Sequence, residues 1–70
     1  MRKKYNKKKL YKVTYINARD GRQTHTFIAK SETALRQDFE EGGARKTADG
    51  QMIYIHRFTT ILNFEEIPWA

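Results

Sequence analysis

The fold is decided by one stretch of the chain, residues 10–30, which reads LYKVTYINARDGRQTHTFIAK. Its two halves, residues 10–16 and 24–29, are rich in β-branched and aromatic side chains, which pack well on a pleated surface. Between them lies Asp20-Gly21, where glycine takes a positive φ at no steric cost. The stretch therefore predicts a β-hairpin that reverses within residues 18–22.

The hairpin has two possible registers, which differ in the side chains that share a face. A two-residue Asp-Gly turn would place Tyr15 opposite Thr26 and would mix apolar and polar residues on both faces. A type I turn with Gly21 as a G1 bulge would instead form the pairs Tyr15–His25, Val13–Phe27 and Tyr11–Ala29. This second register gathers the aromatic and apolar side chains on one face and leaves the other to Lys12, Thr14, Thr24, Thr26, Ile16 and Ile28. Because a slip of one residue would exchange the faces, burial favours the bulged register, which we predict.

A short amphipathic helix is expected over residues 32–41. Ser31 is a good N-cap, and Glu32 in the first turn complements the helix dipole. Leu35 and Phe39 have the i, i+4 spacing that places both on one face. Gly42-Gly43 follows, and glycine readily adopts the left-handed conformation that ends a helix.

The second half of the chain predicts strands around another Asp-Gly reversal. We expect a short strand over 44–47, a turn over 48–50 and a buried or half-buried strand over 51–56. A bend is expected over 57–60, because residues 51–66 are too long for one ordinary strand. Residues 61–65 indicate the last strand, with Leu62 and Phe64 on one face; a helix over 60–67 is the alternative. Pro68 ends either element.

Together these elements predict an α+β fold of order β-β-α-(β)-β-β, a small antiparallel sheet with one helix packed on one face. The seventy residues are expected to form a single domain over 10–70, close to the size at which one core is barely sufficient. The expected core consists of Tyr11, Val13, Tyr15, Phe27, Leu35, Phe39, Ile53, Ile55, Leu62 and Phe64.

The composition favours a soluble protein of a reducing compartment. The chain has no cysteine, so neither a disulfide nor a thiolate metal site is available to stabilise it. No apolar run reaches the length of a membrane span, and the charged N-terminus lacks the apolar stretch of a signal peptide. We therefore expect a cytoplasmic protein that does not interact with membranes.

Charge is distributed very unevenly along the chain. Seven of the fourteen lysines and arginines lie in residues 1–12, where there is no acidic residue. From residue 13 onward there are seven cations and eight acids, so the body of the domain is close to neutral. Residues 1–9 bury little and repel one another, which predicts a basic, disordered N-terminal arm in the free protein.

Such an arm is suited to a polyanion, because phosphate backbones bind lysine and arginine largely irrespective of sequence. Arg19 and Arg22 flank the hairpin turn and extend this surface, and Tyr5 has an aromatic ring for stacking on an unpaired base. The candidate contacts are Arg2, Lys3, Lys4, Tyr5, Lys7, Lys8, Lys9, Lys12, Arg19 and Arg22. The simpler interpretations are a solubilising tail and an ordinary solvated sheet face.

Catalytic signals are weak, and neither an enzyme nor a cofactor is expected. Ser31, the only serine, is explained by its capping position. The two histidines, His25 and His56, are expected on strands as packed or half-exposed rings, without the further donors of a metal site. Glu65 and Glu66 would point to opposite faces of a strand, so they are not a paired acid and base.

Two functional hypotheses remain, and the pattern resembles no family. The first is a small accessory or regulatory protein that binds DNA or RNA through the arm and the hairpin. The second is a protein-interaction module or inhibitor, of the kind encoded by phages and mobile elements, that uses a sheet edge or the apolar residues Ile16, Ile28 and Trp69. A monomer or a weak homodimer is expected in either case.

Overall fold

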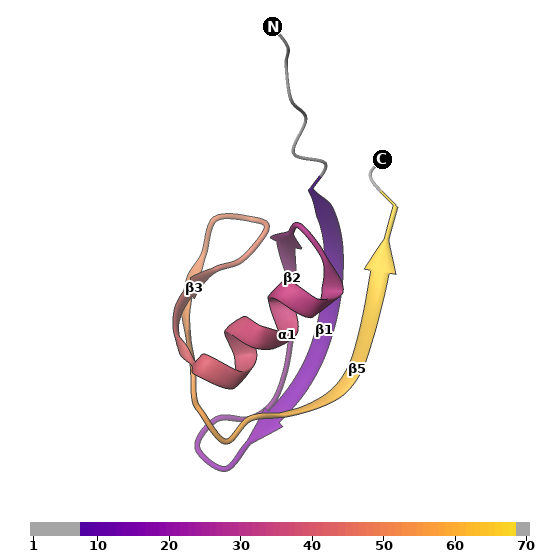
Figure 1. Ribbon diagram of the computed structural model, residues 1–70. Helices are drawn as coiled ribbons and strands as arrows, with labels where there is room; N and C mark the ends of the chain where they lie inside the picture. Colours follow the sequence, from indigo (N-terminus) through magenta and orange to yellow (C-terminus); the bar gives the residue numbers. More distant parts are fainter. Residues whose placement is uncertain (1–7, 69–70) are drawn as a thin grey trace, which may run out of the picture.

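The computed structural model describes residues 8–68, which form five strands and one helix. In chain order these are β1 (Lys9–Asn17), β2 (Gly21–Ala29), α1 (Glu32–Glu41), β3 (Gly43–Lys46), β4 (Met52–Ile55) and β5 (Thr60–Ile67) (Figure 1). This order confirms the predicted α+β class. The strand at 60–67 excludes the alternative of a helix there.

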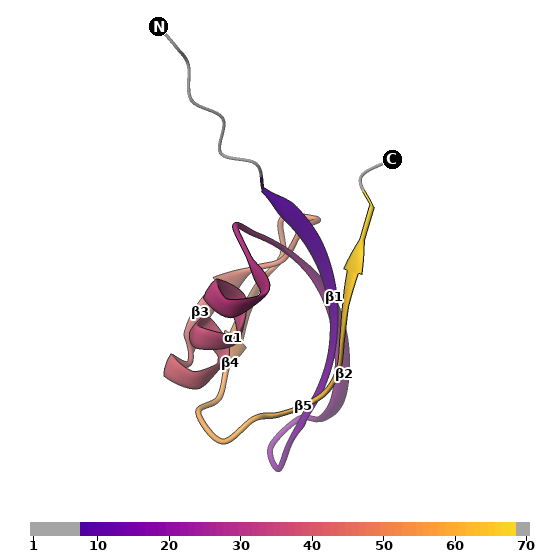
Figure 2. The same cartoon turned by 45° about the vertical axis from the view of Figure 1, so that its right-hand side comes forward.

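The strands divide into two antiparallel sheets. The larger sheet has the order β2-β1-β5, so β1 is its central strand, and β3 pairs only with β4. Figure 2 shows α1 and the β3–β4 hairpin on the same side of the larger sheet, with the other side of the sheet uncovered. No helix within residues 8–68 has the length and apolarity needed to cross a membrane.

The register of the β1–β2 hairpin differs from the predicted one by two residues. Val13 faces His25 and Tyr11 faces Phe27, whereas the prediction paired Tyr15 with His25, Val13 with Phe27 and Tyr11 with Ala29. The faces are unaffected, because a shift of two residues keeps every side chain on its predicted side of the sheet. Tyr11, Val13 and Phe27 are buried, and Lys12 lies on the opposite face.

The cause of the shift is the side chain of Asn17. Its Oδ1 accepts hydrogen bonds from the backbone nitrogens of Arg19, at 3.0 Å, and Asp20, at 2.7 Å. This Asx-type turn closes the reversal one residue earlier, so that Asn17 faces Gly21 across the ladder. Gly21 still supplies the positive φ, at 75°.

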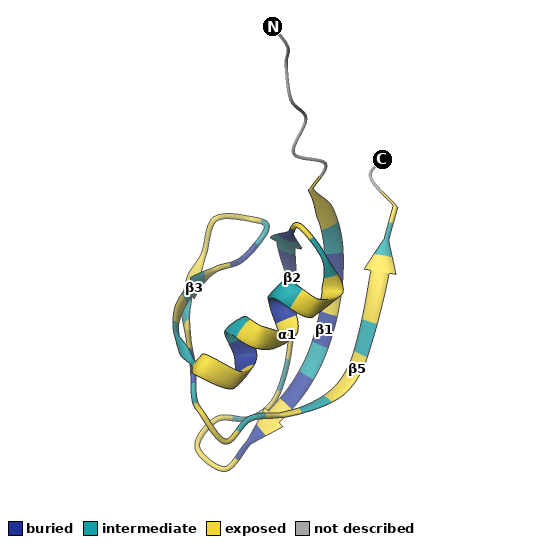
Figure 3. Cartoon of the chain, in the orientation of Figure 1, coloured by how far each residue is buried: buried dark blue, intermediate teal, exposed yellow. Residues whose placement is uncertain are grey.

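The core lies between the larger sheet and the helix. Buried side chains alternate along β1 and recur on one face of α1 (Figure 3). The buried apolar residues are Tyr11, Val13, Tyr15, Phe27, Ala29, Leu35, Phe39 and Ile55, with Ile53, Ile61 and Phe64 packed against them. Rings of Tyr15 and Phe27 meet Phe39 edge-on, with centroids 5.2 and 5.5 Å apart, which ties both strands to the helix.

Leu62 was predicted in the core, and this prediction is wrong. The register of β5 against β1 shifts between Thr14 and Tyr15, whose partners are Asn63 and Ile61, so Leu62 is the extra residue of a β-bulge. Its side chain is 46% exposed. Because of this extra residue, the alternation of side chains between the two faces changes at the bulge. Ile61 therefore packs against the core in place of Leu62.

The helix begins and ends as predicted. Ser31 Oγ accepts a hydrogen bond from the backbone nitrogen of Ala34 at 3.1 Å. At the other end Gly42 has φ 76°, and a Cβ there would come within 2.8 Å of the carbonyl oxygen of Ile55. Glycine is therefore required at this position both by the backbone conformation and by the close approach of β4.

The Asn17 turn predicts a specific loss of stability. Asn17→Ala removes the acceptor of two backbone N–H groups in a partly buried turn, so the free energy of unfolding should fall by about 1–2 kcal/mol. Urea denaturation measures this change. Asn63→Ala is the control, because Asn63 is exposed on β5; an equal loss in the two variants would contradict the role given to Asn17.

Candidate functional site

The ten predicted nucleic-acid contacts divide between described and undescribed parts of the chain. Arg2, Lys3, Lys4, Tyr5 and Lys7 lie outside the described residues, as does Trp69. Lys8 directly precedes β1, Lys9 is the first residue of β1, and both are exposed. The structure therefore gives positions to Lys8, Lys9, Lys12, Arg19 and Arg22.

The uncovered face of the larger sheet can be read in rows from the register. Starting at the end where the chain enters β1, each row gives the residues of β2, β1 and β5 in turn. The rows are Ile28–Leu10–Ile67, Thr26–Lys12–Glu65, Thr24–Thr14–Asn63 and Arg22–Ile16–Thr60. The face is therefore apolar at the end where the chain enters β1 and mostly polar over the rest of its length, with Ile16 as the exception.

Lys12 and Arg22 are the two cations of this open face. Arg22 lies four residues along β2 from the partner of Lys12, which corresponds to about 13 Å at the usual rise of a strand. Among residues 8–68 neither is within ion-pair distance of a carboxylate, although Glu65 lies opposite Lys12 in the sheet. Between them the hydroxyls of Thr14 and Thr24 hydrogen-bond to each other at 3.1 Å.

Arg19 is separated from this pair. It lines an open depression of about 620 Å³ together with Asp20, His25, Tyr54, His56, Tyr15, Gln23 and Ile53. Tyr15, Gln23 and His25 belong to the helix side of the hairpin, so the depression lies on the face of the hairpin opposite to Lys12 and Arg22. The structure brings Lys12 and Arg22 together on one face and leaves Arg19 on the other.

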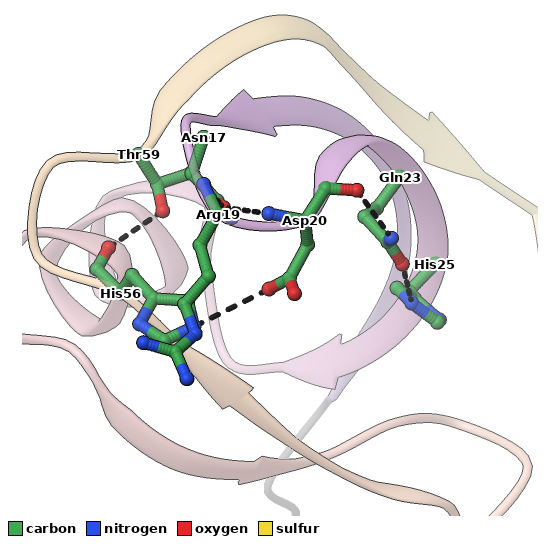
Figure 4. Close-up of polar contacts among 7 residues, drawn as sticks. All are labelled: Asn17, Arg19, Asp20, Gln23, His25, His56 and Thr59. Atoms are coloured by element: carbon green, nitrogen blue, oxygen red, sulfur yellow. Dashed lines mark hydrogen bonds and ion pairs between the residues drawn. The ribbon is translucent and has the colours of Figure 1, made fainter.

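The depression also brings the two histidines near the same hairpin end (Figure 4). His56 Nε2 is 3.3 Å from Asp20 Oδ2, and the ring of Tyr54 meets the ring of His56 with centroids 5.0 Å apart. His25 Nε2 is 3.3 Å from Gln23 Oε1, and Gln23 Nε2 donates to the carbonyl of Asp20. Of these contacts, the one between His56 and Asp20 attaches the β4–β5 loop to the β1–β2 turn.

Both histidines of this arrangement contact other side chains of the protein. One nitrogen of each histidine has a protein partner, and among residues 8–68 no three metal-binding side chains are grouped as an ion would require. Ser31 is engaged in capping the helix. The sequence patterns did not indicate Gln23, Ile53 and Tyr54 as neighbours of the histidines, because that proximity depends on how β4 returns toward the hairpin.

Two arginines of the domain body form ion pairs within the molecule. Arg45 Nη2 donates to the carbonyl of Ile28 at 2.8 Å, and its Nε lies 3.2 Å from Asp38 Oδ2. Arg36 pairs with Glu32 at 2.8 Å and lies over the ring of Phe64, 4.5 Å from its centroid. Their charges are therefore compensated within the molecule.

The chain matches no protein-family model, no curated protein and no solved structure.

Tyr15 at the floor of the depression predicts a pH dependence on the alkaline side. Burial, together with the nearby Asp20 carboxylate, raises the pKa of the Tyr15 hydroxyl above its ordinary value. A group whose pKa is higher in the folded than in the unfolded state contributes stability that is fully present at pH values below its pKa in the unfolded state. This contribution is lost as the pH rises through its pKa in the folded state. Urea denaturation between about pH 8 and pH 11 should therefore show a steeper loss in the wild type than in Tyr15→Phe. Equal slopes in the two proteins would contradict this assignment.

Proposed function

We propose that this protein is a small non-enzymatic accessory factor that binds DNA or RNA through its basic N-terminal stretch. One observation carries the proposal: half of the cations lie in the first twelve residues, without an acid, ahead of a body whose charges balance. A balanced body gives no general attraction to polyanions, so the attraction is concentrated at one end of the chain.

The positions of the last cations of the basic N-terminal stretch support this proposal. Lys9 and Lys12 lie on β1, are exposed, and are in no ion pair among residues 8–68. Arg22 shares the open face with Lys12, so a backbone lying across that face meets both. Arg19 lies on the other side of the hairpin and contributes less to such a surface.

The binding mechanism is electrostatic and independent of sequence. Each lysine or arginine that neutralises a phosphate releases condensed counterions, and the affinity then falls steeply with salt. On the open face the hydroxyls of Thr14 and Thr24 bond to each other, so these two groups are engaged within the protein. An accessory or regulatory role follows from this lack of sequence specificity.

The arm prediction is tested by salt dependence. With five arm cations on phosphates, the slope of log affinity against log salt should be about −4.5 for duplex DNA. Replacing Arg2, Lys3, Lys4, Lys7, Lys8 and Lys9 by Gln should abolish most of the binding and flatten the slope in fluorescence anisotropy. Lys46→Gln, an exposed cation at the end of β3, is the matched control and should bind like the wild type. Full affinity in the six-residue variant would rule out the arm.

The two sides of the hairpin are distinguished by a second comparison. Lys12→Gln combined with Arg22→Gln should reduce the salt slope by about 2, because each removed phosphate contact lowers it by about 1. Arg19→Gln should change the slope by less, since its side chain lines the depression on the opposite side. Anisotropy titrations with duplex DNA and single-stranded RNA at three salt concentrations measure both effects. The reverse order would place the nucleic acid at the depression.

A further inference from the structure

The two edges of the larger sheet differ in how they are covered. At the β2 edge the carbonyl of Thr26 accepts a hydrogen bond from the nitrogen of Ala48 at 2.7 Å, and the carbonyl of Ile28 accepts one from Arg45 Nη2 at 2.8 Å. The turn before β4 and the side chain of Arg45 on β3 thus occupy two carbonyls of this edge. Within residues 8–68 no backbone hydrogen bond covers the outer edge of β5 (Figure 2).

These two contacts also show which backbone groups of β5 point outward. In an antiparallel ladder the N–H and C=O of one residue point to the same side, and successive residues alternate. The backbone groups of Thr26 and Ile28 point away from β1. The backbone groups of Tyr11 on β1 therefore point toward β2, and those of Leu10 and Lys12 point toward β5. In their β5 partners, Ile67 and Glu65, the backbone groups point toward β1. The N–H and C=O groups of Phe64 and Glu66 are therefore directed to the open edge.

The open edge is long and regular enough to accept a strand. The bulge at Leu62 interrupts the pairing only near the start of β5, and residues 63–67 continue without a further shift. Leu62, which directly precedes this segment, is 46% exposed. Proteins use β-bulges and charged side chains to protect sheet edges against the addition of further strands. Here the bulge lies outside residues 63–67, so it does not protect that run.

The charges on this run indicate the kind of strand that fits. Glu65 and Glu66 are consecutive, so one carboxylate lies on each face of the sheet, and neither is in an ion pair among residues 8–68. The nearest cation in the register is Lys12, opposite Glu65, and Arg36 over Phe64 is already paired with Glu32. An added strand with two consecutive basic residues would place one cation on each face.

We propose that the β5 edge binds an extended segment of a partner protein that carries consecutive lysine or arginine residues. Backbone hydrogen bonds to Phe64 and Glu66 hold the segment, and Glu65 and Glu66 select its charge. A second copy fits less well, because pairing β5 with itself would gather four carboxylates in one ribbon. Lys12 lies opposite Glu65 and counts against a basic partner on that face, whereas cations of the chain more than about 8 Å from the edge are screened at physiological salt.

The test uses the full chain and three labelled seven-residue peptides of alternating threonine and valine. One has a central Lys-Arg pair, one a central Glu-Glu pair, and one the Lys-Arg pair with alternate backbone nitrogens methylated. Fluorescence polarisation should detect saturable binding of the first peptide alone. Amide chemical-shift changes should lie on residues 60–67 and not on the β1–β2 turn.

Glu66→Pro removes an outward N–H while leaving the ladder to β1 intact, because proline is tolerated on edge strands. It should weaken the Lys-Arg peptide about tenfold, as expected for one lost hydrogen bond and the ring's obstruction of the edge. Glu66→Gln isolates the charge and should give a smaller loss, and Glu41→Gln, at the end of α1, should have no effect. Circular dichroism and thermal unfolding confirm that each variant folds.

Three outcomes would overturn the proposal. The first is equal binding of the Lys-Arg peptide by Glu66→Pro and wild type. The second is absence of binding at millimolar peptide, and the third is concentration-dependent dimerisation that Glu66→Pro abolishes, which would assign the edge to a second copy. None of these outcomes affects the arm, because nucleic-acid binding is measured separately with the six-residue arm variant.

Discussion

Pairing of β1 on both sides is the constraint on which the rest of the structure depends. A central strand has no free backbone edge, so the alternation of its side chains alone decides what lies above and below the sheet. Tyr11, Val13 and Tyr15 face the helix and are buried, while Lys12 and Thr14 face outward. The same strand begins at Lys9, within the basic stretch, so the core, the open face and the last cations of that stretch are all positioned by β1.

The periodicity of the sequence was sufficient to predict the faces of the strands and the helix. It was insufficient to predict details that depend on contacts between distant residues. Ser31, Leu35, Phe39 and Gly42 carry local information, and the helix they predict has the bounds found in the structure. The register was missed because the side chain of Asn17 acts as a turn acceptor, which the Asp-Gly signal obscured. Leu62 was misplaced because its bulge arises only when β5 pairs with β1.

The candidate site was less predictable than the fold for the same reason. Alternation assigned Lys12 to the open face, but Arg22 was predicted only to flank the turn, and its place on the same face follows from the observed register. Arg19 lies in the turn, where alternation gives no face, and it lines a depression completed by Tyr54 and His56 of the second half of the chain. Proximity between such distant segments follows from packing, which one-dimensional patterns do not encode. The arm itself is a feature of composition and needed no fold to be recognised.

Arg45 and Ala48 have a consequence for how the protein can assemble. By occupying the carbonyls of Thr26 and Ile28, they obstruct part of the β2 edge of the larger sheet, whereas no such contact lies on the β5 edge in the described part of the molecule. Fibre growth by strand stacking requires each subunit to offer two such edges, so that every addition exposes another. Contacts that obstruct one of the two edges of the larger sheet therefore act against continuous stacking through that sheet.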